Sequence, residues 1–121
     1  MTIYFGGCGH GQAALGEKET GLTPAVCTPE AALTAPCVAD FHLLLRAVLA
    51  QGGSAQDYAR RLLAENPDAV LVCDEIGGGI VPLDPDERRW REETGRARGL
   101  LAAADGTRLI RVWYGLPEVL K

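Results

Sequence analysis

The apolar residues of this chain fall into short runs that alternate with helically spaced groups. Apolar or β-prone runs predict strands at 2–5, 25–28, 69–73 and 108–114. Apolar positions that recur every three or four residues predict helices over 12–18, 38–50, 55–65 and 85–104. Because strands and helices alternate, the pattern predicts an α/β fold with a mainly parallel sheet flanked by helices. The length of 121 residues indicates a single domain spanning 1–121.

Capping and breaking residues set several of these boundaries. Asp40 lies near the start of the 38–50 helix, and Ser54 is expected to cap the next helix. Pro85 suits the first turn of the 85–104 helix, because a proline there loses no helical hydrogen bond. The segment 115–117 is expected to close the last strand. His42, on the 38–50 helix, is interpreted as a packed or surface residue rather than a catalytic one.

The stretch from Val70 to Pro82, VLVCDEIGGGIVP, is the centre of the chain. It predicts a buried strand that delivers Asp74 and Glu75 to a glycine-rich loop. In open α/β sheets ligands collect at the carboxyl ends of the strands, so both acids are candidate site residues. We expect Glu75 to face the N-terminal glycine loop with Asp74 beside it, and its replacement to affect ligand binding more than folding. The alternative is a strand that ends in a solvated turn.

A second glycine-rich loop follows the first predicted strand and precedes a predicted helix. Its outer glycines have the spacing of a P-loop, GxxxxGK(S/T), but Gln12 stands where the lysine belongs and Ala13 where the hydroxyl belongs. Backbone N–H groups and a helix N-terminus would still favour an anion. The candidate nucleotide-binding residues are Gly6, Gly7, Gly9, Gly11, Gln12 and Ala13. The alternative is a glycine-rich turn that binds no ligand.

Charge and composition narrow the possible partners. A net charge of -4 and a pI of about 5.1 argue against a general nucleic-acid surface. The arginines between 88 and 98 alternate with acids, which is typical first of a solvated helix face and second of an anion site. No apolar segment approaches the length of a membrane span, and residues 1–7 lack a signal-peptide pattern. We therefore expect a cytoplasmic protein with no membrane partner and with free cysteines.

The last 48 residues resemble the C-terminal half of the adenosylcobinamide kinase/adenosylcobinamide-phosphate guanylyltransferase family of cobalamin biosynthesis. The family has an (S/T)NE(V/I)G-x-GIVP loop, then a helix with an RxFRD-x-x-GR pattern, then a strand before a G-(I/L)-P turn. The residues that match these motifs are Glu75, Ile76, Gly77, Gly79, Ile80, Val81, Pro82, Arg89, Trp90, Arg91, Gly95, Arg96, Gly115, Leu116 and Pro117. Gly6, Gly7, Gly11 and Glu17 fall in register with the family's P-loop, and Asp40 stands in the place of its magnesium-linked aspartate.

The resemblance implies a P-loop NTPase-like (RecA-like) fold in a minimal version and assembly into a homo-oligomer. It implies GTP or ATP with magnesium, bound weakly, or a corrinoid as ligand, and it makes Glu75 and Asp40 candidate catalytic carboxylates. Asp40 is also a possible magnesium ligand. The loop residues assigned to the site are Asp74, Glu75, Gly77, Gly79, Arg89 and Arg91.

The chain departs from the family in the parts that carry out the chemistry. The lysine and serine of the P-loop are replaced, and the segment with the guanylylated histidine, which the family places before the aspartate, is missing. His42 lies on the wrong side of Asp40 to take that role. We therefore expect a degenerate member that binds a nucleotide, a corrinoid or a partner protein without full catalysis. One alternative is an active enzyme that uses Arg89, Arg91 or a neighbouring subunit as the missing cation. Another is a non-catalytic interaction subunit.

Overall fold

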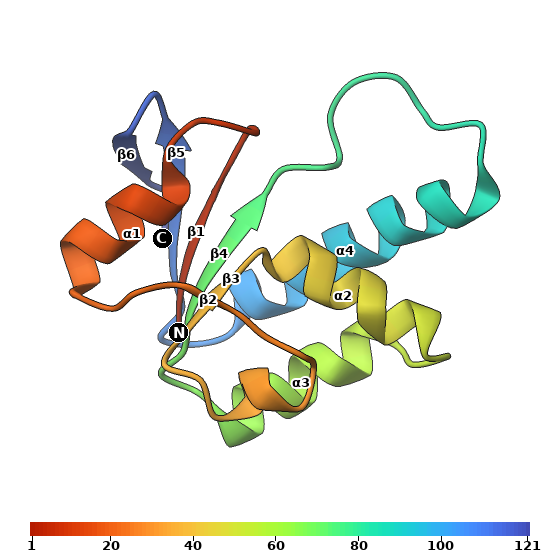
Figure 1. The fold of residues 1–121 in the computed structure, drawn as a ribbon, viewed down its shortest axis with the longest axis horizontal. Helices are drawn as coiled ribbons and strands as arrows, with labels where there is room; N and C mark the ends of the chain where they lie inside the picture. The colour runs from red at the N-terminus through yellow and green to blue at the C-terminus, as the bar shows by residue number, and fades with distance from the viewer.

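The computed structural model describes residues 1–121 and contains one six-stranded sheet with helices on both faces (Figure 1). The strands are β1 (Thr2–Gly6), β2 (Ala25–Val26), β3 (Cys37–Ala39), β4 (Val70–Asp74), β5 (Arg108–Trp113) and β6 (Leu116–Val119). The helices are α1 (Gln12–Thr20), α2 (Phe41–Ala50), α3 (Ala55–Glu65) and α4 (Pro85–Ala103), with a short 3-10 turn η1 (Ala31–Leu33). The expected α/β class is confirmed.

The strands lie in the order β2-β3-β4-β1-β5-β6, and all neighbouring pairs are parallel except β5 and β6. β1 therefore sits inside the sheet, between β4 and β5. In the register of β1 with β4, Gly6 lies opposite Asp74. Because parallel strands end at the same edge of a sheet, the loop after β1 and the acids after β4 meet there. This edge is the one on which a site was expected.

The alternation of side chains along the strands builds one apolar layer on each face of the sheet. On one face Tyr4 packs under α1, where Gly16 lets the helix approach, since a Cβ there would lie 3.3 Å from the Tyr4 ring. On the other face Ile3 and Leu71 join the larger core formed with α2, α3 and α4. Because this alternation continues just past the end of a strand, it also determines to which face of the sheet the next side chain points.

Two segments differ from the sequence expectation. The helix expected from Val38 begins only at Phe41, because Val38 is fully buried in the short strand β3 between β2 and β4. The apolar positions 38, 41, 44 and 45 have helical spacing although 38 belongs to the strand, so the sequence pattern does not show where the strand ends and the helix begins. At the other end of the chain, residues 115–117 do not close the sheet but turn it back into the antiparallel strand β6.

Other expectations concern caps, cysteines and the membrane. Ser54 caps α3 by accepting a hydrogen bond from the Asp57 N–H, and Pro85 begins α4, both as expected. All four cysteines are free thiols. None of the helices combines the length and the apolarity needed to cross a bilayer.

Candidate functional site

The glycine loop between β1 and α1, residues 6–11, is shaped for an anion. Gly9 and Gly11 have φ angles of 79° and 86°, values that side-chain-bearing residues rarely adopt. Six backbone N–H groups donate to no acceptor of the chain, those of Cys8, Gly9, Gly11, Gln12, Ala13 and Ala14, whereas the His10 N–H between them donates to the Gly7 oxygen at 3.1 Å. The last of these form the positive end of the α1 dipole. The loop therefore offers free backbone donors next to a helix N-terminus, the combination that holds phosphate in other proteins.

Gln12 fills the position that a lysine has in a P-loop, and its side chain is almost fully buried, with 4% exposed. Its amide nitrogen lies 3.1 Å from the Gly6 oxygen, 3.2 Å from the Gly7 oxygen and 2.6 Å from Asp74 Oδ1. Three acceptors thus surround an NH2 group with two protons, while the amide oxygen is buried without a partner. An ammonium group, with three donors and a charge, would match this environment better. The surroundings of residue 12 therefore suit a lysine.

Asp74 is the acid that faces the glycine loop, and it is held there by His42. The Asp74 N–H donates to His42 Nδ1 at 3.1 Å, and His42 Nε2 lies 3.7 Å from Asp74 Oδ2. The His42 ring stacks on Trp90, whose indole N–H donates to the His42 oxygen at 2.8 Å. Burial lowers the pKa of His42 by more than the neighbouring Asp74 and Asp40 raise it. His42 is therefore a buried, neutral hydrogen-bond acceptor, as its interpretation as a packed residue predicted.

Glu75 does not face the glycine loop, so this expectation is wrong. Its backbone N–H donates to the Gly6 oxygen at 2.7 Å, but its carboxylate accepts hydrogen bonds from Arg98 at 2.9 Å and from the Gly77 N–H at 2.8 Å. The cause is the alternation of side chains along β4. Asp74 falls on the α1 face with Val72, whereas Glu75 continues the α4 face.

The partner of Glu75 is Arg98, which the sequence indicated only as one arginine of the basic cluster between 88 and 98, not as a site residue. Its guanidinium is largely buried and lies 5.9 Å from the centre of the Phe5 ring. Burial raises the pKa of Glu75, but the hydrogen bonds from Arg98 and from the Gly77 N–H outweigh it, so that the pKa lies below its ordinary value of 4.5. The one sequence signal that could have found this pair is the shared α4 face, since Arg98 follows Thr94 by one helical turn.

The loop after β4 is held in shape by Arg91. Its guanidinium donates to the oxygens of Gly77, Gly79 and Ile80, the last at 2.9 Å. Gly79 has a φ angle of 82°, a conformation that favours glycine, so the backbone requires a glycine at this one of the three successive positions. Ile80 is 95% exposed, so the loop presents apolar side chains to solvent while its backbone is tied down. The Arg91 guanidinium thus donates its hydrogen bonds to the loop after β4 and none to the glycine loop between β1 and α1.

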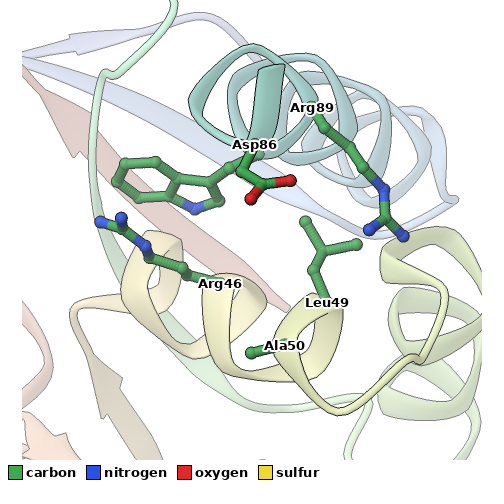
Figure 2. A pocket seen from close by; sticks show the side chains of 6 residues that line it. Arg46, Leu49, Ala50, Asp86 and Arg89 are labelled. Atoms are coloured by element: carbon green, nitrogen blue, oxygen red, sulfur yellow. The ribbon is translucent and has the colours of Figure 1, made fainter. Parts of the chain in front are cut away.

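Arg89 lies elsewhere, in a cavity of about 290 Å³ between α2 and α4. Figure 2 shows Arg46 and Arg89 on opposite sides of this cavity, with Asp86 and Leu49 between them. Arg46 also forms an ion pair with Glu87 and lies over the Trp90 ring. The structure therefore brings neither of the two arginines assigned from the sequence to the glycine loop.

Asp40 follows β3 and occupies the N-cap position of α2. Its backbone is left-handed, with φ 50° and ψ 48°, and its carboxylate caps no helical N–H. A free carboxylate at this edge of the sheet suits magnesium, but Ala13 offers no side-chain oxygen, and no group of three or more His, Cys, Asp or Glu side chains is placed to hold a metal. The chain thus offers magnesium single carboxylates at this edge, Asp40 and Asp74, and no assembled set of ligands, so that phosphate oxygens of a ligand and water would be the other partners.

No protein-family model and no curated protein sequence matches the chain. The geometry of the glycine loop is therefore the observation that bears on function.

Proposed function

We propose that this chain binds the phosphate groups of GTP or ATP in the glycine loop, as a minimal P-loop NTPase-like protein. The observation that carries the proposal is the set of unpaired backbone N–H groups of Cys8, Gly9 and Gly11 to Ala14, at the start of α1. These donors follow a strand inside the sheet, at the edge where ligands of open α/β sheets bind. The lysine-like surroundings of Gln12 support the same proposal.

We further propose that the chain is a degenerate member of the adenosylcobinamide kinase/guanylyltransferase family. Under this proposal it binds a corrinoid in addition to the nucleotide. Three matched segments support it, because they follow parallel strands and so gather at one edge of the sheet. These are the glycine loop after β1, Asp40 after β3 and the 75–82 loop after β4. Asp40 would supply the protein's oxygen ligand to a magnesium ion bound with the phosphates.

Binding is expected to be weak and strongly dependent on salt. The glycine loop has no lysine, and the Asp74 carboxylate beside it repels phosphate, so that backbone dipoles alone attract the ligand. Calorimetry with magnesium–GTP and magnesium–ATP at low and at high ionic strength measures this dependence. The matched variants are Gly9→Ala and Gly106→Ala, since both glycines have φ near 80° and open space around a Cβ.

Both substitutions strain the backbone to a similar extent, but only Gly9 lies in the glycine loop. Gly9→Ala should abolish binding, whereas Gly106→Ala should leave it unchanged. Equal affinities in the two variants, with both folded, would show that the glycine loop does not hold the phosphates.

Full catalysis is not expected. The charge and the hydroxyl that act on the transferred phosphoryl group are missing, and removing one such stabilising donor typically costs about 10² to 10³-fold in rate. Incubation with labelled GTP, followed by denaturing electrophoresis, should give no covalent guanylyl adduct, and adenosylcobinamide should not become phosphorylated. His42 is only 6% exposed and its Nδ1 is occupied by the Asp74 N–H. A labelled band that disappears in His42→Ala would contradict this assignment.

A further inference from the structure

Three rings gather at the turn between β5 and β6, beside the glycine loop. The His10 ring lies 5.9 Å from the Trp113 ring, edge to face, and 5.0 Å from the Tyr114 ring. We call Trp113 and Tyr114 with His10 the aromatic tip. Trp113 is 41% exposed and Tyr114 is 85% exposed, so one side of the tip is open to solvent.

Tyr114 occupies a backbone position that does not suit it. Tyr114 and Gly115 have φ angles of 50° and 76° and are the two central residues of the hairpin turn between Trp113 and Leu116. Such turns favour asparagine, aspartate or glycine at the first of these positions, because a bulky residue is strained in the left-handed region. The ring is also not buried. Neither turn geometry nor core packing therefore accounts for a tyrosine here.

The aromatic tip is fixed to the glycine loop. The Gly115 N–H donates to the His10 oxygen at 2.7 Å, and the Tyr114 N–H donates to His10 Nδ1 at 3.3 Å. A Cβ at Gly11 would lie 3.4 Å from Gly115 Cα, so the turn packs directly against the start of α1. The exposed ring of Tyr114 is thereby held at a constant place relative to the free N–H groups.

A cation supports the aromatic tip from the side. The Arg111 guanidinium lies over the Trp113 ring, 4.1 Å from its centre, and forms no ion pair. This contact covers one face of Trp113 and fixes its ring. Tyr114, whose ring is the more exposed, is left as the surface on which a flat ligand can stack.

We propose that Tyr114 stacks on the base of the nucleotide whose phosphates lie in the glycine loop. The inference rests on the proposed phosphate site and adds the chemical class of the rest of the ligand, a nucleoside phosphate rather than an inorganic phosphate or a phosphorylated aliphatic compound. Every base has a π face, so binding that depends on stacking accepts purines with little preference. GTP and ATP should therefore bind with similar affinity.

The test compares nucleotides with tripolyphosphate, which carries the same phosphates without a base. In calorimetry with magnesium, GTP and ATP should bind the natural protein about tenfold more tightly than tripolyphosphate, which is within the contribution of one stacked base. Tyr114→Asn should remove this difference and leave the affinity for tripolyphosphate unchanged. Asparagine suits the left-handed turn position, so this variant loses the ring without adding strain. Tyr114→Phe should retain the difference, and Leu116→Ala, an exposed neighbour, serves as the control.

A spectroscopic readout locates the base. Trp90 and Trp113 are the two tryptophans of the chain, so Trp90→Phe leaves Trp113 as the single reporter. GTP should change its fluorescence, and tripolyphosphate should not.

The outcomes separate the two proposals. Equal affinities for GTP and tripolyphosphate would overturn the stacking and leave the phosphate site intact. Binding of guanosine that is lost in Tyr114→Asn, without binding of tripolyphosphate, would support the stacking and overturn the phosphate site. No binding of GTP, guanosine or tripolyphosphate would overturn both.

Discussion

The double variant Gln12→Lys/Ala13→Ser is expected to bind magnesium–GTP and magnesium–ATP about tenfold or more tightly than the natural protein. The lysine adds a charge-assisted hydrogen bond to a phosphate, which is worth about 1.5 to 3 kcal/mol. Without ligand, its ammonium group can donate to the Gly6 and Gly7 oxygens and to Asp74, the three acceptors that now surround the Gln12 amide. The serine supplies the hydroxyl ligand that magnesium lacks at this loop.

The matched control is Gln12→Met/Ala13→Ser, in which residue 12 keeps a long side chain but has no charge. Calorimetry on the three proteins should show the gain only with lysine. A gain of the same size with methionine would assign the effect to the serine hydroxyl. If neither variant gains affinity while both keep the fold, the glycine loop does not have a phosphate-binding conformation and the proposed function fails.

Glu75→Ala is expected to lower the free energy of unfolding by about 2 to 3 kcal/mol. Removing one partner of a buried ion pair typically costs about 3 to 5 kcal/mol, and the partial exposure of Glu75, whose side chain is 33% exposed, reduces this cost. Arg98 would be left with a buried charge, since its Nε and Nη1 already have no hydrogen-bond partner. This replaces the sequence-based expectation that the substitution would affect binding more than folding. Urea unfolding measures the change.

The double variant Glu75→Ala/Arg98→Met should recover most of the lost stability, because it removes both charges together. The pH dependence gives a second readout. The pKa of Glu75 is lower in the folded state, so its contribution is complete above the ordinary value of 4.5 and is lost as the pH falls through the lower folded value. The natural protein should therefore lose more stability below pH 4.5 than the double variant. Equal acid sensitivity of the two would contradict a stabilising ion pair.

The sequence predicts the order of the main elements because most of them carry a strong local signal. The sequence runs that form β1 and β4 are apolar and are bounded by glycine or by acids. Ser54 begins α3 because its hydroxyl caps the helix, and Pro85 suits the first turn of α4 because it lacks an N–H. The glycine loop was placed correctly for the same reason. Backbone conformation at a glycine-rich turn depends mainly on residues within that turn.

The contacts that were missed depend on elements far apart in the sequence. β3 has three residues, too few to show a period, and is a strand only because β2 and β4 pair with it. The roles of Asp74 and Glu75 were exchanged, although alternation along β4 would have assigned them. The contact of Asp74 with His42 also joins residues far apart in the sequence, and a single sequence gives no sign of it.

The inner position of β1 has a consequence for how the protein is made. Both neighbours of this strand, β4 and β5, come from residues that the ribosome adds much later, and the hydrogen bond from the Gly115 N–H to the His10 oxygen of the glycine loop forms last. At about 5 to 20 residues per second, roughly 5 to 20 seconds separate the synthesis of residue 6 from that of residue 115. Until residues 70–74 have been synthesised, Ile3, Tyr4 and Phe5 have no strand of the sheet to pair with, so this apolar segment stays unpaired in the nascent chain. The turn between β5 and β6, which contacts the glycine loop, is therefore among the last parts of the fold to be synthesised.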